Sequence, residues 1–184
     1  MPINMFKTTL ILGLLLASTS AHGETQWMGS VNQWSVGFDA AGDASACRLL
    51  WDSEIGKTVE FRAGLKDATW IIGSTQWNIP ADVKTVVTVV DTQRQYHVPG
   101  QFFDKTHLQL WKPLDDAGAG AIRNLVTQAF GGRPDLTLSF SGGEPDWVVP
   151  ISRVAPLYPN FVQCMRQLSN GTADKVAADT TQPF

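Results

Sequence analysis

Short runs in which apolar residues alternate with small or polar ones recur along this chain, and they constrain its fold more than any other feature. Two clear examples are residues 59–66 and residues 136–140, in which every second residue is apolar. A period of two places the apolar side chains on one face of a β-strand and leaves the other face to water. Clusters of Gly, Pro and Asp separate the runs and favour turns. We therefore expect a mainly β, single-domain antiparallel β-sandwich or partly closed barrel.

The same patterns predict the other elements. Further strands are expected at residues 34–38, 47–51, 69–72, 85–90, 95–98 and 107–111. Residues 85–90 form a nearly continuous β-branched run, which predicts a central strand buried on both faces. An amphipathic helix is predicted at about residues 119–130, because apolar residues recur there with helical spacing and a Gly-Gly pair follows. A second short helix is expected to begin near Pro159 and to end by Gly171.

The N-terminus has the pattern of a secretory signal. Lys7 precedes an apolar run at residues 10–17, and small residues then allow cleavage after Ala21 or after Gly23. The run is shorter than the roughly 20 residues that span a bilayer, and no later segment of the mature chain is long enough. We expect a signal peptide at 1–23, a β-rich domain at 24–171, a flexible tail at 172–184, and a periplasmic or secreted location.

The chain contains two cysteines, Cys47 and Cys164, which lie far apart in the sequence. In an oxidising compartment we expect them to form a disulfide that ties the second predicted strand to the C-terminal helix. The alternative is a pair of buried free thiols, because Cys also packs as a small apolar side chain.

Composition excludes some function classes. The net charge of the 184 residues is −3 and only 17% of them are charged, so there is no basic field for nucleic-acid binding. With 43% hydrophobic residues the chain is also unlike disordered sequences.

Motifs for catalysis are weak. His97 and His107 flank an acidic residue, but a zinc site needs three or four ligands, and the usual spacings are tighter. The sequence contains no phosphate-binding loop, dinucleotide fingerprint or nucleophile elbow. We therefore expect no enzyme activity, metal or cofactor. A small secreted hydrolase that uses either histidine with an acidic partner is a remote alternative.

Tryptophan is the one residue type in excess, with seven in the chain. Most of them lie among apolar strand residues and are expected to fill the core. Trp27, Trp77 and Trp147 lie beside polar residues or Pro and are the best candidates for exposure. Flat aromatic rings can stack on sugars, so Trp77 and Trp147 support an alternative function, carbohydrate binding.

Two turn-rich segments, residues 99–106 and 142–159, are the expected contact loops, because function concentrates on loops that a rigid sheet supports. The candidate binding residues are Trp77, Trp147, His97, Phe102, Phe103 and His107.

The order of elements also resembles a known group. A Trp-x-Val strand at residues 34–36 precedes Cys47, a Leu-x-Phe-x-Gly strand end occupies residues 138–142, and a Phe-x-x-Cys at residues 161–164 closes the pattern. The chain thus resembles small periplasmic proteins of Proteobacteria, loosely the invasion-associated locus B group. The resemblance implies a periplasmic location and brings no catalytic residues. The leading hypothesis is an exported, non-enzymatic binding module for a protein, of the inhibitor or immunity type, or for an envelope component.

Overall fold

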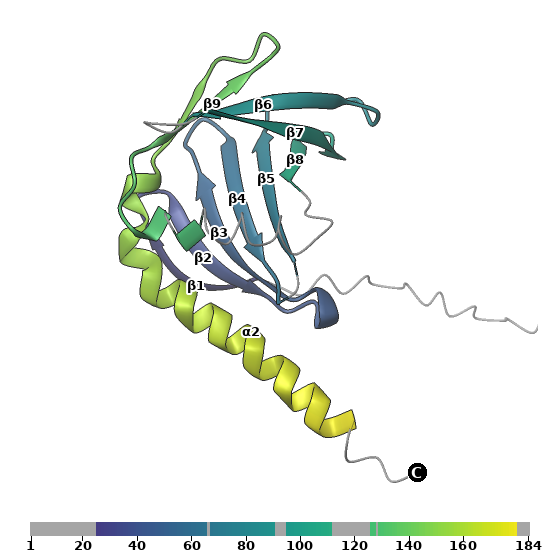
Figure 1. The fold of residues 1–184 in the computed structure, drawn as a ribbon, viewed down its shortest axis with the longest axis vertical. Helices are drawn as coiled ribbons and strands as arrows, with labels where there is room; N and C mark the ends of the chain where they lie inside the picture. Colours follow the sequence, from purple (N-terminus) through teal and green to yellow (C-terminus); the bar gives the residue numbers. More distant parts are fainter. Residues whose placement is uncertain (1–24, 66, 91–94, 112–125, 128, 180–184) are drawn as a thin grey trace, which may run out of the picture.

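The antiparallel β-architecture expected from the alternation is confirmed in the computed structural model of the chain (Figure 1). The structure describes residues 25–65, 67–90, 95–111, 126–127 and 129–179. Within these residues, ten strands form one sheet, accompanied by the long helix α2, Tyr158–Asp179. The strands are β1 (Thr25–Val31), β2 (Trp34–Asp39), β3 (Ala46–Asp52), β4 (Lys57–Ala63), β5 (Ala68–Ser74), β6 (Lys84–Val90), β7 (Gln95–Asp104), β8 (His107–Trp111), β9 (Leu136–Phe140) and β10 (Trp147–Val149).

The strand order follows the chain only in the first half of the sheet. Strands β1 to β5 form a meander, after which the order is β8, β7, β6, β9, β10. The strands β6, β7 and β8 pair in sequence as hairpins, so β8 returns the chain to the side of β5. Figure 1 shows β6, β7 and β9 turned across the upper ends of β3 to β5. The sheet is therefore strongly bent, with β1 and β10 at its two edges.

The core lies on the inner, concave face of this sheet. Trp34, Phe61 and Trp70 are fully buried there, and Phe61 stacks between the two indoles with ring centroids 6.5 and 5.2 Å apart. These residues come from β2, β4 and β5, and each neighbour along its strand points to the outer face. The period of two in the sequence thus separates the apolar core from the outer face.

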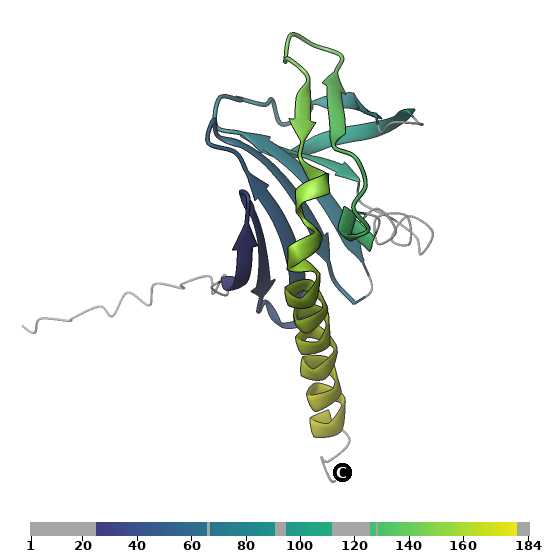
Figure 2. The same ribbon diagram turned by 90° about the vertical axis from the view of Figure 1, so that its left-hand side faces the viewer.

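Helix α2 covers the inner face of β1 to β3, as Figure 2 shows. The predicted disulfide is present: Cys47 of β3 bonds Cys164 of α2 across a sequence separation of 117 residues. Asn160 Nδ2 donates a hydrogen bond to the Met28 carbonyl of β1 (2.6 Å). Trp34 Nε1 donates to the Pro150 carbonyl, just beyond β10 (3.1 Å). The start of α2 is therefore bound to β1, and the segment just after β10 is bound to β2.

The helices differ from the sequence prediction in extent. Residues 119–130 fall largely outside the described part of the chain, although residues 126–127 and 129–130 are helical. Helix α2 begins close to Pro159, as expected, but continues to Asp179 instead of ending by Gly171. The alanines at positions 173, 177 and 178 favour helix and outweigh one glycine. Residues 172–179 of the predicted tail are thus helical. The predicted signal peptide and residues 180–184 lie outside the described residues, and none of the described helices is long and apolar enough to cross a membrane.

One strand prediction and two loop predictions need correction. Strand β6 is buried on one face only, because Val87 is buried while Val86 is 44% exposed. A β-branched run therefore indicates a strand but does not show that both faces are covered. Most of the predicted loop at residues 99–106 belongs to β7, where Pro99 pairs with Val86. The predicted loop at residues 142–159 contains β10 and the 3-10 turns η2 (Ile151–Arg153) and η3 (Ala155–Leu157).

Candidate functional site

Trp77 and Trp147, the two candidate sugar-binding tryptophans, contact each other. Their rings stack with centroids 5.2 Å apart, and Phe140 lies within 5.9 Å of both ring centroids. Trp147 is only 2% exposed and Trp77 is half-buried. Trp147 therefore presents no free ring face, and one face of Trp77 is occupied by its neighbour.

A single carboxylate holds this aromatic pair. Trp77 Nε1 and Trp147 Nε1 donate hydrogen bonds to the two oxygens of Glu144, at 2.9 and 2.6 Å. Lys57 Nζ lies 3.6 Å from Glu144 Oε1 and 4.8 Å from the Trp147 ring centroid. Burial alone would raise the pKa of the Glu144 carboxyl, but the indole donors and Lys57 outweigh it and hold this pKa below its ordinary value.

The lowered pKa predicts a specific acid sensitivity. A carboxyl of this kind stabilises the fold above its ordinary pKa, here 4.5, and that stability is lost as the pH falls through the folded value. Glu144→Gln replaces one of the two accepting oxygens with an NH2 group, which cannot accept from an indole, and should lower the free energy of unfolding at pH 7 by about 1–3 kcal/mol. Chemical denaturation at pH 7 and pH 3.5 should show that the variant loses less stability on acidification than the wild type. A loss equal to that of the exposed control Glu54→Gln at both pH values would contradict this role.

The two histidines occupy separate surroundings. His97 is exposed on β7, with Nδ1 3.1 Å from Thr88 Oγ1. His107 begins β8, with Nδ1 2.9 Å from Asp104 Oδ1, and its ring packs against Gly73. Their imidazole Nδ1 atoms have different partners, and no cluster of three or more His, Cys, Asp or Glu that could hold a metal ion occurs among the described residues.

Phe102 and Phe103 lie near the end of β7. The register of β7 with β8 shifts between Phe102 and Asp104, so Phe103 has no cross-strand partner there. Phe103 is 47% exposed, whereas Phe102 is half-buried. The predicted binding residues thus divide among three places: the Trp77–Trp147 pair bound to Glu144, the exposed surface of β7, and the turn from β7 to β8.

The outer face of the sheet carries a network of charged side chains. The alternation in β4 predicts that Glu60 and Arg62 lie on this face, but the sequence does not show which other residues join them. We call the network, together with the neighbouring indole, the Trp27 patch; its residues are Thr25, Trp27, Asp39, Arg48, Glu60 and Arg62. Arg48 donates to both carboxylate oxygens of Glu60, at 2.7 and 2.8 Å. Arg62 bonds Asp39 and places its Nε 3.1 Å from Glu60 Oε1. Thr25 donates to Asp39 at 2.6 Å, so strands β1 to β4 all contribute.

The guanidinium groups are the solvent-facing part of this network. The Arg62 and Arg48 side chains are 33% and 21% exposed, whereas Asp39 and Glu60 are 10% and 11% exposed. Burial alone would lower the pKa of Arg48, but the hydrogen bonds and charges of Glu60 and Asp39 outweigh it and raise this pKa above its ordinary value. In this patch the two guanidinium groups are therefore nearer the solvent than the carboxylates of Asp39 and Glu60 with which they pair.

Trp27 lies beside these guanidinium groups at the edge of the sheet. It is 52% exposed, and the Arg48 guanidinium carbon is 5.8 Å from its ring centroid. A Cβ added at Gly37 would lie 3.0 Å from the indole, so the absence of a side chain there lets the ring lie close against β2. Of the three tryptophans expected to be exposed, Trp27 is the one with a largely open ring.

Comparison of the chain with known proteins identifies no similar protein. No family model matches the chain, and no curated protein or solved structure matches it. Any conclusion on function therefore depends on the geometry of the described residues.

Proposed function

We propose that this chain is an exported, non-enzymatic binding module that recognises a protein partner through the Trp27 patch. The observation that supports it is the pairing of a half-exposed indole with two partly exposed guanidinium groups on the face of the sheet opposite α2. Trp and Arg are the residue types that most often dominate binding energy at protein interfaces. The disulfide and the core hold this surface rigid, which lowers the entropy cost of binding.

The exposed chemistry indicates the kind of partner. Arg62 and Arg48 already pair with carboxylates beneath them, but their side chains remain 33% and 21% exposed. Arg binds carboxylates with two parallel hydrogen bonds, and an indole buries a large apolar area. We therefore expect a protein that presents an acidic side chain beside an apolar one.

Capture from the native cell envelope tests the proposal. The wild type should retain one protein, and Trp27→Ala should weaken this binding about 30-fold, the loss expected for an interface residue worth about 2 kcal/mol. Tyr96→Ala is the matched control, because Tyr96 is a similarly exposed aromatic residue on β7, outside the patch. It should bind the partner like the wild type.

Two outcomes would overturn the proposal. Equal loss of binding in Trp27→Ala and Tyr96→Ala would show that the patch is not the contact surface. Retention by purified cell-wall glycan, with no protein captured, would favour the carbohydrate-binding alternative. Circular dichroism of each variant should match the wild type, since Trp27 lies outside the buried core.

A further inference from the structure

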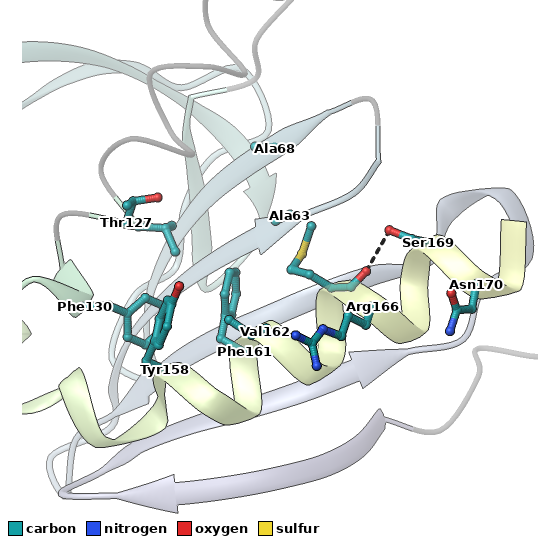
Figure 3. A pocket seen from close by; sticks show the side chains of 12 residues that line it. Ala63, Ala68, Thr127, Phe130, Tyr158, Phe161, Val162, Arg166, Ser169 and Asn170 are labelled. Carbon is teal, nitrogen blue, oxygen red and sulfur yellow. Dashed lines mark hydrogen bonds between the residues drawn. The ribbon is translucent and has the colours of Figure 1, made fainter. Parts of the chain in front are cut away.

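A groove lies between α2 and the ends of β4 and β5, on the side of the sheet away from Trp27 (Figure 3). Its volume is about 470 Å³, within the range of small-molecule sites. Two alanines, Ala63 and Ala68, pair across β4 and β5 and form its floor. Because both side chains are small, space remains between the sheet and the helix.

The lining changes character along the helix. Phe130, Tyr158 and Phe161 form an aromatic cluster at one end, with Phe130 5.5 Å from Tyr158 and 5.2 Å from Phe161 between ring centroids. Val162 and Met165 continue the apolar wall. Arg166, Ser169 and Asn170 then make the lining polar, and Figure 3 shows Arg166 between the aromatic cluster and the more distant Ser169 and Asn170.

The cation at the polar part of the groove has no counter-charge among the residues that the structure describes. Arg166 is exposed, and no ion pair to it occurs within the described part of the chain. Arg48 and Arg62, in contrast, each pair with carboxylates. Within the described residues, the groove thus combines an apolar wall with one positive charge, that of Arg166, that has no ion-pair partner.

We propose that this groove binds a single-chain amphiphile, with its alkyl chain against the aromatic cluster and its anionic head at Arg166. From Tyr158 to Arg166 the helix rises about 12 Å, at about 1.5 Å per residue, comparable to an extended chain of about ten carbons. Burial of apolar surface supplies the affinity, and the guanidinium selects a carboxylate or phosphate head over a neutral one. The site is separate from the Trp27 patch, so either assignment can fail without the other.

Titration of the folded, oxidised protein with dodecanoate tests the site, with isothermal calorimetry as the readout. The wild type should bind one dodecanoate below the concentration at which this acid forms micelles. Arg166→Glu should weaken binding at least 10-fold, whereas Arg153→Glu, the same charge change at an exposed arginine outside the groove, should leave it unchanged. Val162→Trp, which fills the groove from the helix, should abolish binding.

Dodecan-1-ol separates the contribution of the head from that of the chain. It should bind more weakly than dodecanoate to the wild type and equally to the wild type and Arg166→Glu. Several results would overturn the proposal: no binding of dodecanoate, binding that only micelles produce, or binding that Val162→Trp leaves intact. Equal weakening by Arg153→Glu would show a general charge effect instead of a site.

Discussion

Replacing both cysteines with alanine should lower the free energy of unfolding by about 5 kcal/mol. The Cys47–Cys164 bond closes a sequence separation of 117 residues, and cross-linking so long a loop removes much entropy from the unfolded chain. A loss of this size equals the total stability of many domains of this length. Urea denaturation of the oxidised wild type and of the double variant measures the difference directly.

Chemical reduction provides the matched control for this result. Wild type that is unfolded in the presence of a strong reductant should lose most of the stability that the double variant loses, because both lack the cross-link and only the variant also lacks the two buried sulfur atoms. A difference below about 1 kcal/mol between oxidised and reduced protein would contradict a stabilising role for the disulfide. It would mean that the contacts of α2 with β1 to β3 hold the helix in place without the bond.

Phe61→Ala should have the second-largest effect, a loss of about 3–5 kcal/mol in the free energy of unfolding. Phe61 is buried between the rings of Trp34 and Trp70, so its removal leaves a cavity that these large indoles cannot fill without leaving their own positions. Phe103→Ala is the control, because Phe103 is 47% exposed and should cost less than about 1 kcal/mol. Denaturation midpoints and slopes of the three proteins give the comparison. Equal losses in the two variants would contradict the assignment of the core.

The features that the sequence predicts well are local ones. The period of two in residues 59–63 correctly places Val59 and Phe61 in the core and Glu60 and Arg62 on the other face. The predicted disulfide is also confirmed, since the chain has two cysteines and they bond each other. In both cases, the information lies in the residues themselves or in their count.

The features that the sequence does not predict depend on pairing across the chain. Strand β1 contains Gly29 and an irregular register with β2, so its apolar residues do not alternate regularly. Strand β10 has three residues, too few for a periodic signal. Trp77 and Trp147 both lie beside turn residues, which favours exposure, yet Glu144 draws their indoles together from distant parts of the chain. The same limit applies to the Trp27 patch, whose charges come from four strands.

Site-specific photo-crosslinking in cells that make the protein tests the central claim, that the Trp27 patch contacts a protein partner. A photoreactive residue at Ser30, which is exposed on β1 near Trp27, should crosslink to one envelope protein. The same residue at Ile55, exposed in the turn between β3 and β4, should give no such product. The Ser30 crosslink should disappear when Trp27→Ala is added. Crosslinks of equal strength from both positions, or a Ser30 product that survives Trp27→Ala, would contradict the account.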